Sequence, residues 1–253
     1  MSKKTPWLKI FNPQSQTKLR LFCLPYCGGG TSIFRDWSNN LPANVEVCGL
    51  RLPGRENRIL ETPFQELSIL IQALEKALLP HLQKVPFAFF GHSMGALIAF
   101  ELTRALRRQN NLQPVHLFVS GFRAPNSANP MDSWGEISPD FVLEELRKLG
   151  GIPERVLNNP DILQKILPTI YADIHIVKTY TYKEETPLDC PISALGGSED
   201  GLFSHQSIAC WKQQTQNYFH LQMFPGDHFF LHNAQTSLLN YLSQEIKKYL
   251  SEV

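Results

Sequence analysis

The sequence predicts an α/β protein with a mostly parallel central sheet flanked by helices, because short apolar runs alternate along it with helical patterns. Its 253 residues fit one large α/β domain, which we expect to span residues 1–253. Apolar runs predict strands at residues 19–25, 45–52, 87–90, 115–120, 191–195 and 220–224. Apolar residues at helical spacing predict helices near residues 67–78, 94–108 and 236–250.

The alternation of strands and helices stops between about residues 124 and 188. Helical patterns cover residues 139–149 and 161–178, the second interrupted by Pro168, and no strong strand lies between them. Ser138 precedes a proline, as an N-cap does, and Gly150 suits the position after a helix end. We expect a helical lid inserted at about residues 124–188, with a purely structural helical layer as the alternative.

Composition narrows the class of partner and the compartment. Lys plus Arg is 24 and Asp plus Glu is 23, so the formal net charge of +1 gives no reason to expect nucleic acid or an anionic membrane. No apolar run follows the basic N-terminus and no stretch approaches the roughly 20 apolar residues of a membrane span. The five cysteines form no C-x-x-C pair, which favours reduced thiols and a cytoplasmic protein.

The strongest chemical signal is the segment Gly-His-Ser-Met-Gly at residues 91–95. It follows an expected strand directly and precedes an expected helix directly, which is the context of a nucleophile elbow. Such a turn is so tight that the positions two residues from the serine cannot carry bulky side chains, and Gly91 and Gly95 meet that demand. The sequence therefore predicts an α/β-hydrolase fold with Ser93 as the nucleophile.

A serine nucleophile needs a base. In this architecture the three catalytic residues occur along the chain in the order serine, acid, histidine. The histidines after Ser93 are His116, His175, His205, His220, His228 and His232. His228 alone lies in a turn after the expected final strand, whereas His116 and His220 belong to strands and His175 to the insertion. The spacing of His228 and His232 could suggest metal ligands, but no third ligand is evident and no metal is expected. We take His228 as the base.

The acid is expected on the loop after the penultimate strand, where residues 196–201 read GGSEDG. Asp200 is the best candidate, because from there it can accept the Nδ1 proton of His228 and fix the tautomer of the ring. Glu199 is the nearest rival, and Asp227 adjoins the histidine in a geometry that rarely lets a carboxylate reach the ring.

Acyl transfer also needs two hydrogen-bond donors for the oxyanion. The backbone N–H of Met94, directly after the nucleophile, is one. The second is expected from the loop after the first long strand, where Cys27 precedes three glycines, and the Cys27 N–H is the predicted donor. The glycine run lacks the Lys-Ser/Thr of a phosphate-binding loop, and the remaining alternative is a plain turn.

Taken together, the motifs resemble those of type II thioesterases, the free-standing editing hydrolases of nonribosomal peptide and polyketide synthases. The resemblance covers residues 19–245 and lies in LPYCGGGTSIFRDW (24–37), LPGRENR (52–58), GHSMGA (91–96), LGGSED (195–200) and FPGDHFF (224–230). It carries catalytic roles onto Ser93, Asp200 and His228, and oxyanion roles onto Cys27 and Met94. The family more often has alanine at position 27, and it has a helical lid where the insertion lies here.

The resemblance implies an acyl or peptidyl carrier protein as partner, whose phosphopantetheine arm presents the substrate, with no cofactor in the enzyme itself. We therefore expect a monomeric serine hydrolase that removes acyl or aminoacyl groups stalled on carrier domains. Serine, histidine and aspartate also serve esters and amides, so the substrate does not follow from these residues alone. The alternatives are a medium-chain acyl-CoA or fatty-acyl thioesterase, a general carboxylesterase, and a catalytically silent binding protein of the hydrolase fold.

Two weaker expectations concern surfaces. The apolar residues of the insertion could line an acyl channel or pack on the sheet; they are Ile162, Leu163, Ile166, Leu167, Ile170 and Ile174. Carrier proteins are typically acidic, so arginines could receive one; the candidates are Arg51, Arg55, Arg58 and the face of Arg104 to Arg108.

Overall fold

The computed structural model describes residues 5–135, 138–151 and 154–251. It contains one seven-stranded sheet in the order β1-β3-β2-β4-β5-β6-β7. The strands are β1 Leu8–Phe11, β2 Leu19–Leu24, β3 Val45–Leu50, β4 Phe87–His92, β5 His116–Ser120, β6 Ile192–Gly197 and β7 Phe219–Phe224. All neighbouring pairs are parallel except β1 with β3, which is antiparallel. The predicted, mostly parallel sheet is confirmed.

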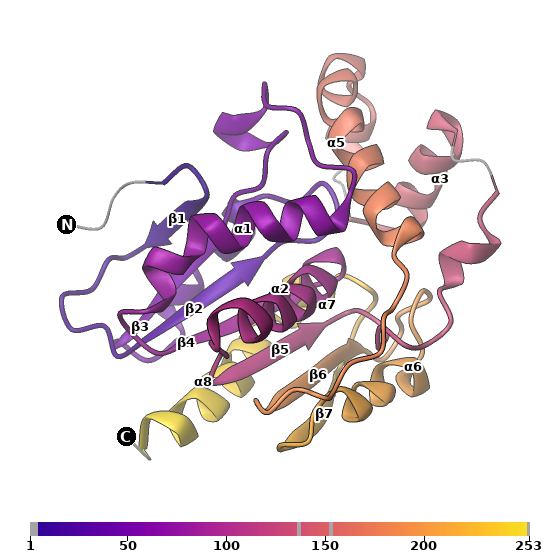
Figure 1. The fold of residues 1–253 in the computed structure, drawn as a ribbon. Coiled ribbons are helices and arrows are strands. Elements are labelled where there is room, and N and C mark those ends of the chain that lie inside the picture. Colours follow the sequence, from indigo (N-terminus) through magenta and orange to yellow (C-terminus); the bar gives the residue numbers. More distant parts are fainter. Residues whose placement is uncertain (1–4, 136–137, 152–153, 252–253) are drawn as a thin grey trace.

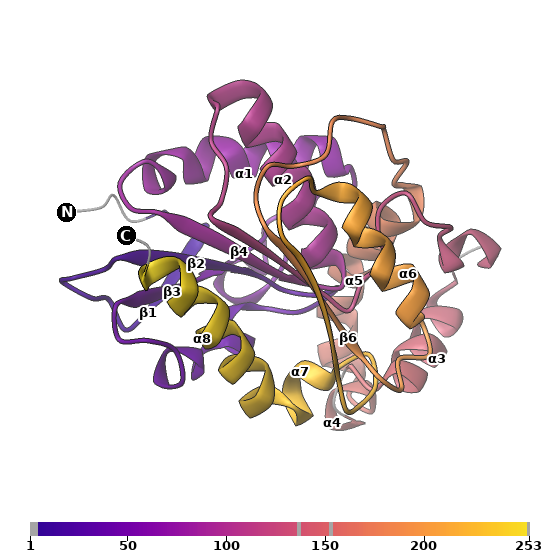
Figure 2. The ribbon, with the colours of Figure 1, turned by 90° about the horizontal axis from the view of Figure 1, so that it is seen from below.

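The helices are α1 Leu67–Leu82, α2 Met94–Asn110, α3 Pro139–Leu149, α4 Glu154–Leu157, α5 Pro160–Thr179, α6 His205–Ala209, α7 Phe230–Asn233 and α8 Gln235–Ser251. Short 3-10 turns lie at Thr31–Phe34, Trp37–Asn39, Glu56–Arg58, Pro130–Ser133 and Cys210–Gln214. Seen from below, α1 and α2 cover one face of the sheet and α8 covers the other (Figure 2). The fold thus has the three layers expected of parallel strands with crossover helices.

Both faces of the sheet are buried, and successive residues of a strand serve opposite cores. In β4, Phe89 belongs to the apolar cluster that contains Leu74 of α1 and Leu97 of α2, whereas Phe90 belongs to the cluster that contains Leu238 of α8. A strand buried on both faces needs a continuous apolar run rather than an alternating one. This is why the run at residues 87–90 could be recognised as a strand.

Among the strand boundaries that differ from the prediction, two bear on the site, because strand pairing there continues past the apolar runs. Strand β4 extends through Gly91 and His92, which pair with Val119 and Ser120 of β5. Strand β6 extends to Gly197, which pairs with Phe224. The catalytic loops expected at these places therefore begin directly at the carboxyl edge of the sheet.

The segment between β5 and β6 contains α3, α4 and α5, which lie beyond the carboxyl ends of the strands (Figure 1). The expected N-cap is present, because the Ser138 hydroxyl accepts a hydrogen bond from the Phe141 N–H at 3.2 Å. Gly150 ends α3 in the left-handed conformation, with φ +71°. The predicted interruption at Pro168 is wrong: α5 runs through it, and the proline costs one backbone hydrogen bond without ending the helix.

Helix α5 belongs to two apolar clusters. Ile176 and Val177, near its C-terminus, join the core beneath α1 and α2. Ile170 and Ile174 instead pack with Val142 and Leu146 of α3 in a separate small cluster. Of the six residues considered for an acyl channel, Ile170 and Ile174 are therefore packing residues, whereas Ile162 is 39% exposed.

A buried histidine makes the stability of this fold sensitive to acid. Burial, and to a lesser extent the charge of Lys248, lower the pKa of His116 from 6.5 to about 3. Its Nε2 lies 2.8 Å from the Ser193 hydroxyl, and its ring stacks on Phe118. Because the pKa of His116 is lower in the folded protein than in the unfolded chain, its contribution to the free energy of unfolding is complete above pH 6.5. That contribution is lost as the pH falls from 6.5 toward 3.

We expect this histidine to lower the free energy of unfolding by about 2 kcal/mol between pH 7 and pH 5. Urea denaturation at both pH values checks this. His116→Phe should show a smaller loss between the two pH values than the unsubstituted protein, whereas His175→Gln, at an exposed position of α5, should show the same loss. An equal loss in His116→Phe would contradict the assignment.

Candidate active site

Ser93 occupies a strained turn between β4 and α2. Its backbone has φ +56° and ψ −121°, a conformation that costs a non-glycine residue about 1–3 kcal/mol. The turn is held by the Ser93 N–H, which donates to the Ser120 carbonyl at 2.7 Å. A Cβ on Gly91 would lie 2.1 Å from the Gly95 carbonyl oxygen, and one on Gly95 would lie 2.3 Å from that of Leu24. Both glycines are therefore required by close backbone approach.

His228 links the hydroxyl of this serine to a carboxylate. Its Nε2 lies 3.0 Å from the Ser93 Oγ, and its Nδ1 lies 2.9 Å from the Asp200 Oδ2. The side chains of His228 and Asp200 are 4% and 0% exposed. The ionised carboxylate can only accept, so Nδ1 carries the proton and Nε2 is free to accept the serine proton. The three predicted residues are brought together in the order needed for nucleophile activation.

Asp200 is kept ionised by three hydrogen-bonded groups, although its burial disfavours the charged form. Burial alone would raise its pKa, but hydrogen bonding and charge from His228 and the N–H groups of Leu202 and Phe203 hold that pKa below its usual value. The two amides donate to Oδ1 at 2.8 and 3.1 Å. One carboxylate oxygen is thus held by the backbone, and the other is directed at the imidazole.

The loops that carry Asp200 and His228 approach each other at a glycine. A Cβ on Gly197 would lie 2.2 Å from the Asp227 carbonyl oxygen, so no other residue fits there without movement. Beside it, the Glu199 N–H donates to the Gly226 carbonyl at 2.9 Å. Backbone contacts between the two loops therefore set the distance between acid and base.

The rival carboxylates are placed elsewhere. Glu199 is exposed, and the Asp227 carboxylate accepts from the Phe229 N–H at 2.7 Å rather than from the imidazole. His232 Nε2 lies 3.0 Å from the Tyr26 hydroxyl. In the part of the chain that the structure describes, no group of three or more His, Cys, Asp or Glu side chains could hold a metal.

Sequence reasoning did not single out His92, which packs beneath the site. It is fully buried, its Nδ1 lies 2.9 Å from the Ser120 hydroxyl, and its ring centroid lies 5.4 Å from that of His228. Burial first, and then the charges of His228 and His232, keep the pKa of His92 well below 6.5. A neutral ring at this place packs against His228 without adding a positive charge beside it. The signal available in the sequence was only its place inside the elbow.

The two predicted oxyanion donors lie on the segments that follow β4 and β2. Met94 is the first residue of α2, and the N–H groups of a first helical turn have no intrahelical acceptor. Cys27 lies in a turn closed by the Gly29 N–H, which donates to the Tyr26 carbonyl at 2.9 Å. Burial and the charge of Asp173 raise the pKa of the Cys27 thiol, so it stays protonated and unreactive.

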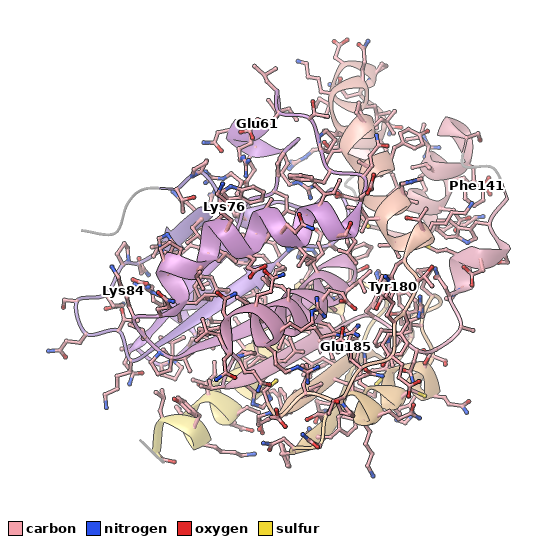
Figure 3. The ribbon with its side chains drawn as sticks, in the orientation of Figure 1. Glu61, Lys76, Lys84, Phe141, Tyr180 and Glu185 are labelled. Atoms are coloured by element: carbon pink, nitrogen blue, oxygen red, sulfur yellow. The ribbon has the colours of Figure 1, made fainter. Side chains whose placement is uncertain are left out.

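The arginines considered for a docking face are bound within the chain. Arg58 is buried and pairs with Glu61 at 2.6 Å, and Arg104 pairs with Glu101 at 2.6 Å and with Glu185 at 2.8 Å. Figure 3 shows Glu185 on the segment after α5, beside α2. Glu185 also pairs with Arg108 at 2.5 Å. These charges are compensated by acidic residues of the same chain.

The sheet, the elbow and the placing of Ser93 define a protein of the α/β-hydrolase class. The sequence profile of the thioesterase domain family matches residues 19–246. The gramicidin S biosynthesis protein GrsT of Aneurinibacillus migulanus is 41% identical over 251 residues, which cover 99% of this chain and 98% of that protein.

Solved structures agree with this match. The RedJ thioesterase from the prodiginine biosynthetic pathway in Streptomyces coelicolor has a TM-score of 0.84 and 35% identity, and covers 90% of this chain and 86% of its own. The type II thioesterase BorB from the borrelidin biosynthetic cluster has a TM-score of 0.84 and 30% identity, and the match covers 94% of this chain and 96% of BorB. This chain belongs to the thioesterase domain family, among the type II thioesterases, and is a hydrolase that acts on thioesters.

No helix in the described part of the chain is both long and apolar enough to cross a membrane.

Proposed function

We propose that this thioesterase removes acyl and aminoacyl groups from the phosphopantetheine arms of carrier proteins in a peptide or polyketide synthase, with Ser93 as its nucleophile. The observation that carries the proposal is the continuous hydrogen-bonded array of Asp200, His228 and Ser93 at the elbow. The similarity to GrsT and BorB, whose names place them in gramicidin S and borrelidin biosynthesis, supports the choice of substrate.

In the acylation half-reaction, the Ser93 Oγ attacks the thioester carbonyl carbon while the Nε2 of His228 takes the hydroxyl proton. The carbonyl oxygen becomes an oxyanion, which accepts hydrogen bonds from the N–H groups of Cys27 and Met94. The C–S bond then breaks, and His228 gives its proton to the departing pantetheine sulfur. Asp200 stabilises the imidazolium throughout, without itself being protonated.

In the deacylation half-reaction, water takes the place of the thiol. His228 removes a proton from this water, whose oxygen attacks the carbonyl carbon of the acyl ester on Ser93. The same two N–H groups hold the second oxyanion, and the proton returns to the Ser93 Oγ as the free acid leaves. The enzyme needs no cofactor for either half-reaction.

We assign the segment at residues 124–188 as a lid on a single domain. Its helices lie beyond the carboxyl ends of the strands (Figure 1), and Ser93 and His228 follow the carboxyl ends of β4 and β7 in the chain. The small α3–α5 cluster around Ile170 and Val142 is separate from the main core, so α3 and this part of α5 can shift while Ile176 and Val177 keep the end of α5 in that core. We expect the enzyme to act as a monomer in the cytoplasm.

The substrate class is tested by comparing matched acyl groups on a phosphopantetheinylated carrier protein, on CoA and as p-nitrophenyl esters. A kcat/KM at least about 10-fold higher for the carrier-bound thioester is expected, because contacts with the carrier add transition-state binding. A higher value for acyl-CoA would point to a fatty-acyl thioesterase. A higher value for the oxygen ester would point to a general esterase.

The thiol of Cys27 is expected to be dispensable. Because the proposed donor is the backbone N–H, Cys27→Ala should keep kcat within about 3-fold of the original value, and iodoacetamide should not inhibit the unsubstituted enzyme. Steady-state kinetics on the carrier-bound thioester checks both statements. A loss of more than about 100-fold in Cys27→Ala would show that the thiol itself takes part in the reaction. The backbone N–H would then not be the whole contribution of Cys27 to catalysis.

A further inference from the structure

A buried ion pair joins the lid to the glycine loop of the proposed oxyanion hole. Asp173 on α5 is 2% exposed and Arg55 is 5% exposed. The Asp173 Oδ1 lies 2.8 Å from the Arg55 Nη2, and its Oδ2 accepts a hydrogen bond from the Gly28 N–H at 2.8 Å. The carboxylate thus connects a side chain 118 residues away in sequence to a backbone amide of the loop.

Arg55 holds the same loop from its other side. Its Nη1 donates to the Gly29 carbonyl at 3.1 Å, and its Nε donates to the Pro53 carbonyl at 3.3 Å. Both members of the ion pair therefore bind the backbone of adjacent glycines. Since the pair is buried, these bonds are weakly screened by solvent.

The consequence concerns the orientation of the Cys27 N–H. Each peptide unit is planar and trans, so a hydrogen bond that orients its C=O or its N–H also orients the other group of that unit. The unit before the Cys27 Cα is held at the Tyr26 carbonyl by the Gly29 N–H, and the unit after it is held at the Gly28 N–H by Asp173. The Cys27 N–H therefore has its direction set on both sides of its own Cα.

Helix α5 also packs directly on this loop. A Cβ on Gly28 would lie 2.9 Å from the Ile170 Cγ1, and Gly28 has φ +71°. One turn before Asp173, the Thr169 hydroxyl donates to the Gly54 carbonyl at 2.5 Å. The bonds to the loop thus exist only when this part of α5 is docked.

We propose that Asp173 is a positioning residue: it directs the Cys27 N–H at the oxyanion and makes the docking of lid helix α5 a condition for stabilising the transition state. The inference rests on the proposed function, because it takes Cys27 as an oxyanion donor. Arg55 neutralises the carboxylate, which would otherwise repel the negative charge that develops nearby. Movement of the lid would then switch the chemical step as well as access to the site.

Two double variants test the role of the carboxylate oxygen without leaving an unpaired buried charge. Arg55→Met with Asp173→Leu removes the ion pair and the acceptor for the Gly28 N–H. Arg55→Met with Asp173→Asn removes the same charges but keeps an acceptor oxygen. Replacement of a buried ion pair by uncharged residues is commonly tolerated by the fold. Glu46→Gln is the control, because Glu46 forms a buried pair with Arg20 at 2.7 Å near the opposite, amino ends of the strands.

Three quantities are measured on the unmodified and variant enzymes: kcat per site titrated with a fluorophosphonate, KM, and the inhibition constant of a trifluoromethyl ketone. The Ser93 Oγ adds to the carbonyl carbon of this ketone, which forms a tetrahedral adduct with an oxyanion. We expect the leucine-containing variant to lose about 10- to 100-fold in kcat and in ketone affinity, with KM within about 3-fold. The asparagine-containing variant should keep most of both, and Glu46→Gln should keep all three values. A merely structural role would reduce the number of titrated sites without changing the affinity of the remaining ones.

Equal kcat and equal ketone affinity in the two double variants would overturn the proposal. Thr169→Val provides a second test if the leucine-containing protein does not fold, since it removes a contact of α5 while keeping the side-chain shape. A full kcat in Thr169→Val would count against a role for lid docking. Failure of the proposed function looks different, because the unsubstituted enzyme would then prefer acyl-CoA or the oxygen ester to the carrier-bound thioester, or would not react with the ketone at Ser93.

Discussion

Ser93→Ala is expected to reduce kcat/KM for the preferred thioester by at least about 10⁴-fold while the protein remains folded. The substitution removes the atom that forms the acyl ester, and His228 then has no nucleophile to deprotonate. The residual rate would come from substrate binding and from the N–H groups of Cys27 and Met94, which the substitution leaves in place. Stopped-flow or steady-state hydrolysis of a carrier-bound acyl group measures the loss.

The fold should tolerate this change, because among the described residues the Ser93 Oγ forms one hydrogen bond, to His228, and the residue keeps its strained turn with either side chain. Thermal unfolding should therefore differ little from that of the original protein. Labelling by a fluorophosphonate should disappear in Ser93→Ala and persist in Ser127→Ala. Ser127 is a suitable control because it is a serine near the start of the lid and outside the array of Asp200, His228 and Ser93. Retained turnover by a folded Ser93→Ala protein would remove Ser93 from the mechanism.

Much of the fold and of the candidate site could be predicted because the signals are local. Strands buried on both faces appear as continuous apolar runs, and β4 joined to α2 through Gly91 and Gly95 is such a case. The order of serine, acid and histidine then placed Asp200 and His228 on the loops after β6 and β7. The structure brings these residues within hydrogen-bond distance of each other.

Features that depend on distant pairing could not be predicted in this way. Strand β1, only four residues long, is defined by its antiparallel pairing to β3 rather than by its own sequence. Arg55 was considered for an acidic partner, because nothing near it in sequence reveals Asp173 on α5. His92 similarly gains its role from Ser120 and His228, which lie on other elements. Helix α5 passes through Pro168 because its docking on both apolar clusters outweighs one lost hydrogen bond.

Asp200→Asn is expected to lower kcat by about 10³- to 10⁴-fold with little change in KM, because it reverses the tautomer of His228. The carboxylate accepts from Nδ1–H, which leaves Nε2 as an acceptor toward the Ser93 hydroxyl. An asparagine at this place keeps the Leu202 and Phe203 N–H groups on its oxygen and so presents its NH₂ group to the ring. The proton then moves to Nε2, where it blocks removal of the serine proton.

Glu199→Gln is the matched control for this prediction, since it removes a neighbouring carboxylate that is exposed and is bound to Gly226 only through its backbone N–H. It should retain kcat within about 2-fold, as exposed substitutions away from the reacting atoms usually do. Acid adds a second readout: the depressed pKa of Asp200 means that its stabilising contribution is present above about pH 4 and is lost as the pH falls further. Asp200→Asn should lack that part of the acid dependence. If Glu199→Gln were the inactive variant instead, the carboxylate that orients His228 during turnover would be Glu199, and the loop after β6 would have to rearrange when substrate binds.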